Sequence, residues 1–166
     1  MATKTMEDLF LDGIKDIYYA ERKIVAGLKK MIRGAEAPEL KAAFDKHLQE
    51  TEGQVERLVQ VFELLGKPAR GKTCPAIDGI LEEGQEILEE FKDSPALDAG
   101  LLAAAQAVEH YEIARYGTLK SWAIQLGKTD VAKLLDQTLA EETKTDQALT
   151  QLAEAKVNPE GKTKAA

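Results

Sequence analysis

The chain has 166 residues, 44% of them hydrophobic, so it is long enough to bury a sizeable core, and we expect one domain over residues 1–166. Its 29 acidic residues outnumber its 22 basic ones, and the net charge of -7 argues against a nucleic-acid partner. The sequence shows no apolar run that could cross a bilayer and no secretion signal at its N-terminus, which favours a cytoplasmic protein with no membrane partner.

The first two predicted elements are long helices joined by a short turn. Thr5 can cap the first helix, whose apolar residues recur at helical spacing until Gly34. Pro38 is placed for the first turn of the second helix, which ends at Gly66. Because the turn between them is short, the two helices should form an antiparallel pair.

A long connection over residues 67–94 separates this pair from the next. It opens as a loop and then shows a weaker helical pattern over residues 77–91. A connection of this length can return the chain along the whole bundle, and the long helices that flank it would then be parallel. We therefore expect a crossover that carries a short fifth helix.

The last two long helices form the second predicted pair. The third starts after Ser94 and ends at Gly127, and Thr129 can cap the fourth, which continues to about Val157. The polar tail over residues 158–166 is expected to fray. Since no strand pattern occurs, the fold class is all-α: a ferritin-like four-helix bundle with a short extra helix in the long crossover.

The alanine-rich run over residues 103–122 carries acids where apolar residues belong. Glu109 and Glu112 share one helical stripe with Leu102 and Ala105, so both face the predicted core. A buried carboxylate without a partner takes up a proton rather than stay charged. The two acids are therefore protonated, paired with arginine or bound to a cation, and matching acids on other helices would favour the cation.

Helical angles identify inward polar positions on the other three long helices as well. Glu21 lies near the centre of the apolar face of the first helix, and His47 borders that of the second. On the fourth helix Glu142 nearly shares the centre of the apolar face, and Asp146 follows one turn later. The four helices can thus bring several acids and one histidine together inside the bundle.

An internal repeat indicates a different pair of acids. The separation that joins Glu21 to Glu112 also joins Glu50 to Glu141, as expected for two helical hairpins related by a pseudo-twofold axis. Such an arrangement suits a two-metal centre. Helical angle instead favours Glu142 on the fourth helix, because Glu141 lies well to the side of the apolar face.

On the second helix both candidates stay open. Glu50 lies far from the apolar face and His47 lies at its edge, but a His-x-x-Glu pair can reach one cation from neighbouring turns. The candidate metal ligands are therefore Glu21, His47, Glu50, Glu109, Glu112, Glu142 and Asp146.

The chemistry of this set favours particular metals. Carboxylates with a single imidazole suit iron(II), manganese(II) or, less specifically, magnesium and calcium, whereas one cysteine, Cys74, excludes a thiolate zinc site. A carboxylate-bridged pair of iron or manganese ions fits best. Tyr116 falls on the inner stripe and could touch a bound ion, whereas His110 points away from the core.

Four segments carry a resemblance to a known family. They are AERKI around Glu21, FDKHLQET at Phe44–Thr51, AAAQAVEHYEIARYGTL at Ala103–Leu119 and LLDQTLAEETKTDQALT at Leu134–Thr150. Together they resemble the YciE/YciF family of ferritin-like bacterial stress proteins. This resemblance implies a ferritin-like fold, a homodimer rather than a storage cage, and a di-metal site.

The sequence departs from the usual ferritin-like pattern at two places. Glu50-x-x-Gly53 and Glu141-x-x-Lys144 stand where that pattern has Glu-x-x-His pairs. Two hypotheses for the function follow. The first is a di-iron or di-manganese oxidoreductase that removes peroxide or oxidises iron under stress. The second is a non-catalytic stress protein that acts through its helical surface and holds structural metal or none.

Overall fold

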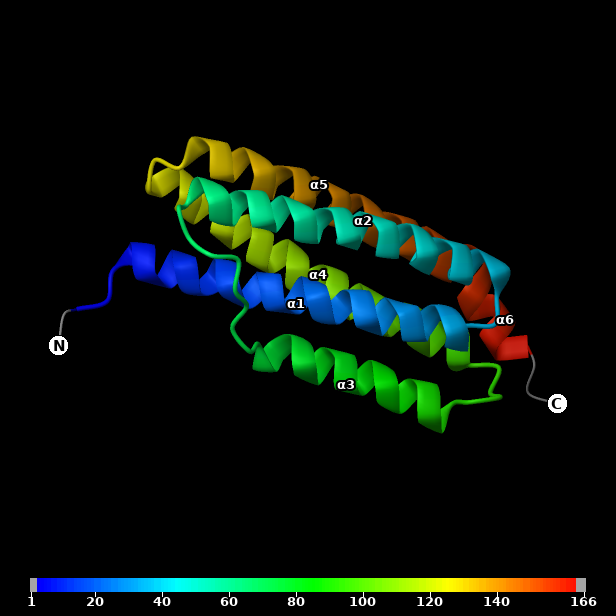
Figure 1. The fold of residues 1–166 in the computed structure, drawn as a ribbon. Helices are drawn as coiled ribbons and strands as arrows, with labels where there is room; N and C mark the ends of the chain where they lie inside the picture. Colours follow the sequence, from blue (N-terminus) through cyan, green and yellow to red (C-terminus); the bar gives the residue numbers. More distant parts are fainter. Residues whose placement is uncertain (1–2, 164–166) are drawn as a thin grey trace.

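The computed structural model describes residues 3–163 and shows four long helices packed as a bundle, with no strand in that range (Figure 1). This confirms the predicted all-α fold class with an extra helix in the crossover. The elements are α1 (Met6–Gly34), α2 (Pro38–Leu64), α3 (Pro75–Glu90), α4 (Leu97–Gln125), α5 (Thr129–Leu152), a π-helical segment (Ala153–Val157) and α6 (Asn158–Thr163).

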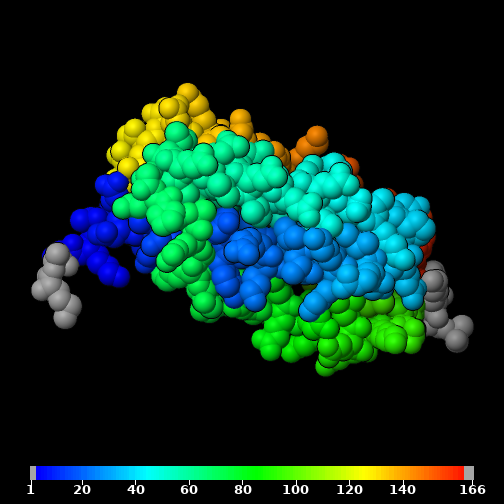
Figure 2. All heavy atoms as spheres, viewed as in Figure 1, coloured from blue at the N-terminus to red at the C-terminus, as the bar shows by residue number. Residues whose placement is uncertain are grey.

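The crossover sets the topology of the bundle. Residues 65–74 lead to α3, which lies along α1 and α4, so that α2 and α4 run in the same direction (Figure 1). On the face shown in Figure 2, α1 lies between α2 and the green α3. The predicted crossover and its short helix are therefore confirmed.

Small residues let α3 approach the bundle closely. The side chain of Leu81 packs over Gly27, and that of Leu88 packs over Gly34. The two contacts are about two helical turns apart on both helices. The loop before α3 is also held, because Lys72 N–H donates to the carbonyl of Lys15 at 3.1 Å. The crossover is thus attached to α1 along its whole length.

The helix starts follow local chemistry in one case and tertiary structure in another. At α1, Thr5 and Asp8 form a reciprocal capping box, as the sequence predicts for Thr5. The predicted cap at Thr129 is wrong: Lys128 is the N-cap residue and Thr129 is already helical. Gly127, with φ of 71°, lies in the turn that ends the preceding helix, and α5 begins one residue earlier than predicted.

The tail predicted to fray from residue 158 is instead helical through Thr163, and residues 164–166 lie outside the described residues. Tertiary contacts explain the difference. Val157 is buried, and Lys156 pairs with Glu39 on α2. These contacts stabilise the helix in a segment where composition alone predicts a frayed tail.

The interior of the bundle changes character along its length. Apolar side chains fill both ends, whereas the middle of each long helix contributes buried polar residues. None of the described helices is long and apolar enough to cross a membrane. The interior of the bundle is therefore apolar at both ends and polar in the middle.

Candidate metal centre

The polar centre gathers ionisable side chains from all four long helices. Glu21 comes from α1, His47 from α2, Glu109 and Glu112 from α4, and Glu142 from α5. Each of these side chains is at most 2% exposed. They sit inward because each occupies a position on the apolar face of its helix. We call these five residues the central cluster.

Four members of the central cluster lie within coordination range of one another. His47, Glu109, Glu112 and Glu142 each offer one ligand atom, and these atoms all lie within 4.8 Å of each other. His47 Nδ1 is 3.0 Å from Glu109 Oε1, and His47 Nε2 is 3.8 Å from Glu142 Oε2. Neither contact has the geometry of a hydrogen bond. These four buried atoms therefore lie close together, and each lacks a hydrogen-bond partner.

Glu21 joins the cluster through two neighbours. The hydroxyl of the fully buried Tyr116 donates to Glu21 Oε1, and, in addition to burial, the charge of Glu142 is close enough to raise the pKa of Glu21. The hydroxyl of Tyr116 thus orients one oxygen of Glu21 and leaves Glu21 Oε2 without a partner. Tyr116 therefore contacts a candidate ligand.

The centre concentrates unsatisfied polar atoms. Within residues 3–163, nine buried side-chain nitrogen and oxygen atoms lack a hydrogen-bond partner, and all belong to the central cluster or to the adjacent Gln54. Buried polar atoms are nearly always paired in native proteins, because each unpaired atom carries a desolvation cost of about 1–3 kcal/mol. Carboxylate oxygens with one imidazole are donors that iron(II) and manganese(II) accept, so the residues present fit such ions.

The pKa values of the cluster follow from its burial. Burial, with the charge of Glu142 as the second cause, raises the pKa of Glu21 to about 8. Burial also raises the pKa of Glu109 to about 8 and those of Glu112 and Glu142 well above the usual range. Burial lowers the pKa of His47, whose neutral imidazole is the form that binds metal. In the metal-free protein at neutral pH, the acids therefore hold protons that a cation would displace.

Two of the candidate ligands lie outside this group. Glu50, whose side chain is 28% exposed, pairs with Lys46 at 2.9 Å and accepts a hydrogen bond from Thr145 at 3.2 Å. Asp146 Oδ1 lies 3.1 Å from His110 Nε2. Both acids are partly exposed, although the helical angle of Asp146 predicts that it faces inward, and both have protein partners. The structure thus places them at the border of the central cluster rather than inside it.

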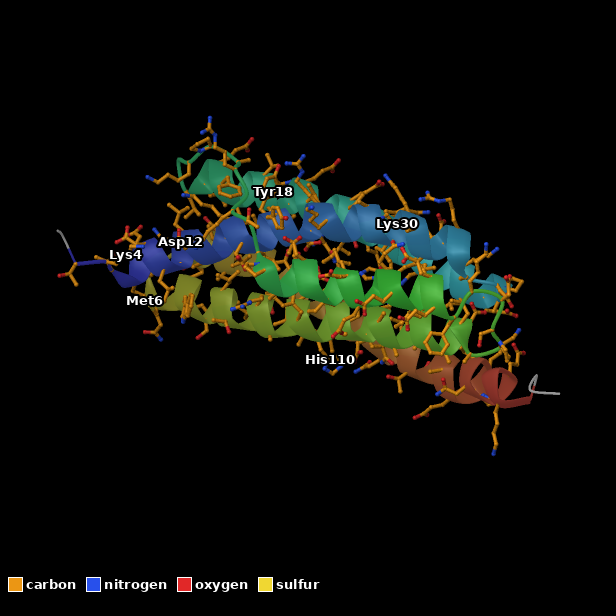
Figure 3. All side chains as sticks on the ribbon, turned by 90° about the horizontal axis from the view of Figure 1, so that it is seen from below. Lys4, Met6, Asp12, Tyr18, Lys30 and His110 are labelled. Atoms are coloured by element: carbon orange, nitrogen blue, oxygen red, sulfur yellow. The ribbon has the colours of Figure 1, made fainter. Side chains whose placement is uncertain are left out.

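Glu141, the acid that the internal repeat favours on α5, does not point into the bundle. Glu141 is bound by Arg57, with Nη2 2.8 Å from Oε1 and Nη1 2.9 Å from Oε2. Gly53 and Lys144, which stand at the histidine positions of the Glu-x-x-His pattern, are both exposed. Figure 3 shows His110 projecting away from the bundle, as its helical angle predicts. The inward positions on α2 and α5 belong to His47 and Glu142.

Sequence reasoning missed Gln54. This buried residue follows His47 by two helical turns on the same face of α2, and its amide Nε2 donates to Glu142 Oε1. Its helical angle was a usable signal, but an uncharged amide does not stand out among acids. Arg57, which binds Glu141 next to it, has no such signal in the sequence.

Comparisons with known proteins all relate this chain to the same protein family. Residues 5–161 match the family model DUF892, a domain of unknown function. Protein YciF of Escherichia coli K12 is 45% identical over 166 residues, which cover 99% of this chain and 100% of the relative. The crystal structure of this E. coli stress protein has a TM-score of 0.89 and covers 94% of this chain and 99% of its own.

A second solved structure supports the same grouping. It is YcfI from Rhodopseudomonas palustris, 50% identical, with a TM-score of 0.86 and coverage of 89% of this chain and 94% of that one. A protein from Xanthomonas campestris, 23% identical with a TM-score of 0.73, shares the fold.

Proposed function

Because the chain belongs to the DUF892 family and resembles the stress protein YciF over its whole length, we propose that it is a stress-response metal protein with two iron or manganese ions in the bundle. The residues that would hold them are the central cluster: Glu21, His47, Glu109, Glu112 and Glu142. We further propose that it is a cytoplasmic homodimer.

One observation carries this proposal. The buried, unpaired side-chain atoms of the described residues are concentrated at the centre of the bundle, where they come from all four long helices. Divalent cations would satisfy them together by replacing the protons that the buried carboxyls otherwise hold. No surface ion pair or single hydrogen bond could satisfy so many atoms at once.

The chain's own residues define what such a centre can do. A bound iron or manganese pair would supply the Lewis acidity and one-electron steps that peroxide removal or iron oxidation requires. His47 offers a neutral imidazole nitrogen, and Tyr116 holds Glu21 by one oxygen. Glu21 and Glu109, whose pKa values are about 8, release protons on ligation and can take them up again. The apolar ends of the bundle exclude bulk water.

A second candidate function rests on the same pKa shifts. Acids that keep their protons at neutral pH are uncharged, so the cluster can exist without metal. The protein would then be a non-catalytic stress protein that acts through its helical surface, with structural metal or none. The metal-free form of this second function predicts no bound ion, whereas the first function predicts two ions per chain.

Element analysis separates them. Purified protein is stripped with a chelator, loaded anaerobically with iron(II) or manganese(II), and freed of excess metal before analysis. Two ions per chain are expected for the wild type, and unchanged content for the Asp136→Asn control, which breaks an exposed pair with Lys120. A wild type that retains no ion contradicts the metal proposal and favours the interaction module.

A further inference from the structure

Gln54 is the uncharged neighbour of the central cluster. It is fully buried on α2, and its Nε2 donates to Glu142 Oε1 on α5. The same nitrogen also donates to Glu141 Oε2 at 3.1 Å. One amide group therefore bridges an acid of the cluster and an acid outside it.

The outer acid is held in turn by arginine. Arg57 binds both oxygens of Glu141 through its guanidinium fork and donates to Thr138 Oγ1 at 2.7 Å. A bidentate pair fixes the plane and position of a carboxylate more strictly than a single contact does. Because the amide of Gln54 donates to this fixed carboxylate, the Arg57–Glu141 pair also determines where the second N–H of the amide points.

This chain of contacts has a consequence for Glu142. Its Oε1 is engaged by Gln54, while its Oε2 has no hydrogen-bond partner and faces His47 Nε2 at 3.8 Å. The amide therefore selects which oxygen of Glu142 is presented to the cluster. We propose that Gln54 is a positioning residue of the metal centre, oriented by Arg57 and Glu141, which holds Glu142 in a ligating geometry.

This inference rests on the proposed metal centre and names three residues beyond the ligands themselves. A Gln54 that served only to join α2 and α5 would contribute to stability alone. A positioning residue contributes to metal affinity beyond its contribution to the stability of the metal-free fold. Removal of such partners typically weakens metal binding by about 10-fold to 100-fold.

The test compares metal dissociation constants, measured for manganese(II) by competition with a chromophoric chelator, in purified full-length protein. Gln54→Met keeps the length of the side chain and removes the amide, and Arg57→Lys keeps the charge and removes the fork. Both variants should bind about tenfold or more weakly with unchanged stoichiometry. Asp136→Asn, which breaks a remote ion pair between α4 and α5, should bind as the wild type does.

A double variant tests whether Arg57 acts through Gln54. In the Gln54→Met background, Arg57→Lys should weaken binding no further, whereas independent effects that multiply would overturn the relay. Wild-type affinity in Gln54→Met, with only the metal-free melting temperature lowered, would overturn the positioning role and leave the metal centre standing. A wild type that binds no manganese or iron would overturn both.

Discussion

The burial of individual acidic side chains determines how the protein responds to pH. The carboxyls of Glu21 and Glu109 ordinarily have a pKa of 4.5, which burial raises to about 8 in the folded chain. Between these values the unfolded chain releases protons that the folded chain keeps. The stability that these two groups contribute is therefore fully present at the acid end and is lost as pH rises through this window.

We accordingly expect the free energy of unfolding of metal-free protein to fall between about pH 5 and pH 8. His47 opposes this trend, because burial lowers its pKa and its contribution rises through the ordinary histidine pKa of 6.5, but one histidine faces several acids. Denaturant titrations in the presence of a chelator measure the slope. Stability that increases over this range would show that the acids are ionised in the folded state.

The ionisable carboxyls of Glu109 and Glu142 can also be replaced by amides of nearly the same shape. A ligand that binds only the folded state stabilises it by about 3–4 kcal/mol at a hundredfold to thousandfold excess over the dissociation constant. Manganese(II) or iron(II) should therefore raise the melting temperature of the wild type. The double variant Glu109→Gln/Glu142→Gln should lose this response and be no less stable than the wild type without metal.

Thermal melts with and without metal check this expectation, and Asp136→Asn serves as the matched control. The acids would be structural hydrogen-bonding residues if the double variant unfolds readily and no metal raises the melting temperature of the wild type.

Helical angle predicted the inward residues well, because burial on a regular helix depends on position along a stripe. Glu21, His47, Glu109, Glu112 and Glu142 all lie inside. Whether Glu50 and Asp146 reach the central cluster could not be decided from the sequence. It depends on how each helix is rotated, and packing between the helices sets that rotation. Gln54 and Arg57 could not be ranked from sequence, since their importance comes from cross-helix hydrogen bonds.

Among the structural elements, the crossover loop packs closely against α1 at Gly71. A Cβ at Gly71 would lie 3.0 Å from Tyr19 Cβ and 3.2 Å from its Cα, and backbone atoms cannot move aside as a side-chain end can. Gly71→Ala should destabilise the protein by about 1–3 kcal/mol. Gly53→Ala is the matched control, since it meets no atom within 4 Å in an exposed helical turn and should stabilise by about 0.5–1 kcal/mol.

Denaturant unfolding at neutral pH distinguishes the two alanine variants. Equal effects on the free energy of unfolding would mean that the loop is not packed against α1 as described.

The helices α1 and α2 could be predicted because their apolar residues recur at helical spacing and each has a local start signal, Thr5 for α1 and Pro38 for α2. The bounds of later elements could not be placed to the residue. The start of α5 depends on the turn at Gly127, and the helical tail depends on contacts of Lys156 and Val157 with distant parts of the chain. The contacts of Lys156 and Val157 cannot be predicted from local composition.

For the molecule as a whole, the assembly remains a prediction. A homodimer is the assembly that the sequence resemblance implies, and each chain contains a complete central cluster. Light scattering of the purified protein should give a mass near twice 18.2 kDa. A shell-sized particle would argue against a dimer and favour a storage role.

Metal binding in the middle of the bundle can be observed directly. Anomalous diffraction from crystals loaded with manganese(II), recorded where manganese scatters anomalously, locates such ions. We expect two peaks among Glu21, His47, Glu109, Glu112 and Glu142, and none at the same place in Glu109→Gln/Glu142→Gln. Loaded wild-type crystals with no peak at the central cluster, or with manganese only at the surface, would refute the proposed metal centre.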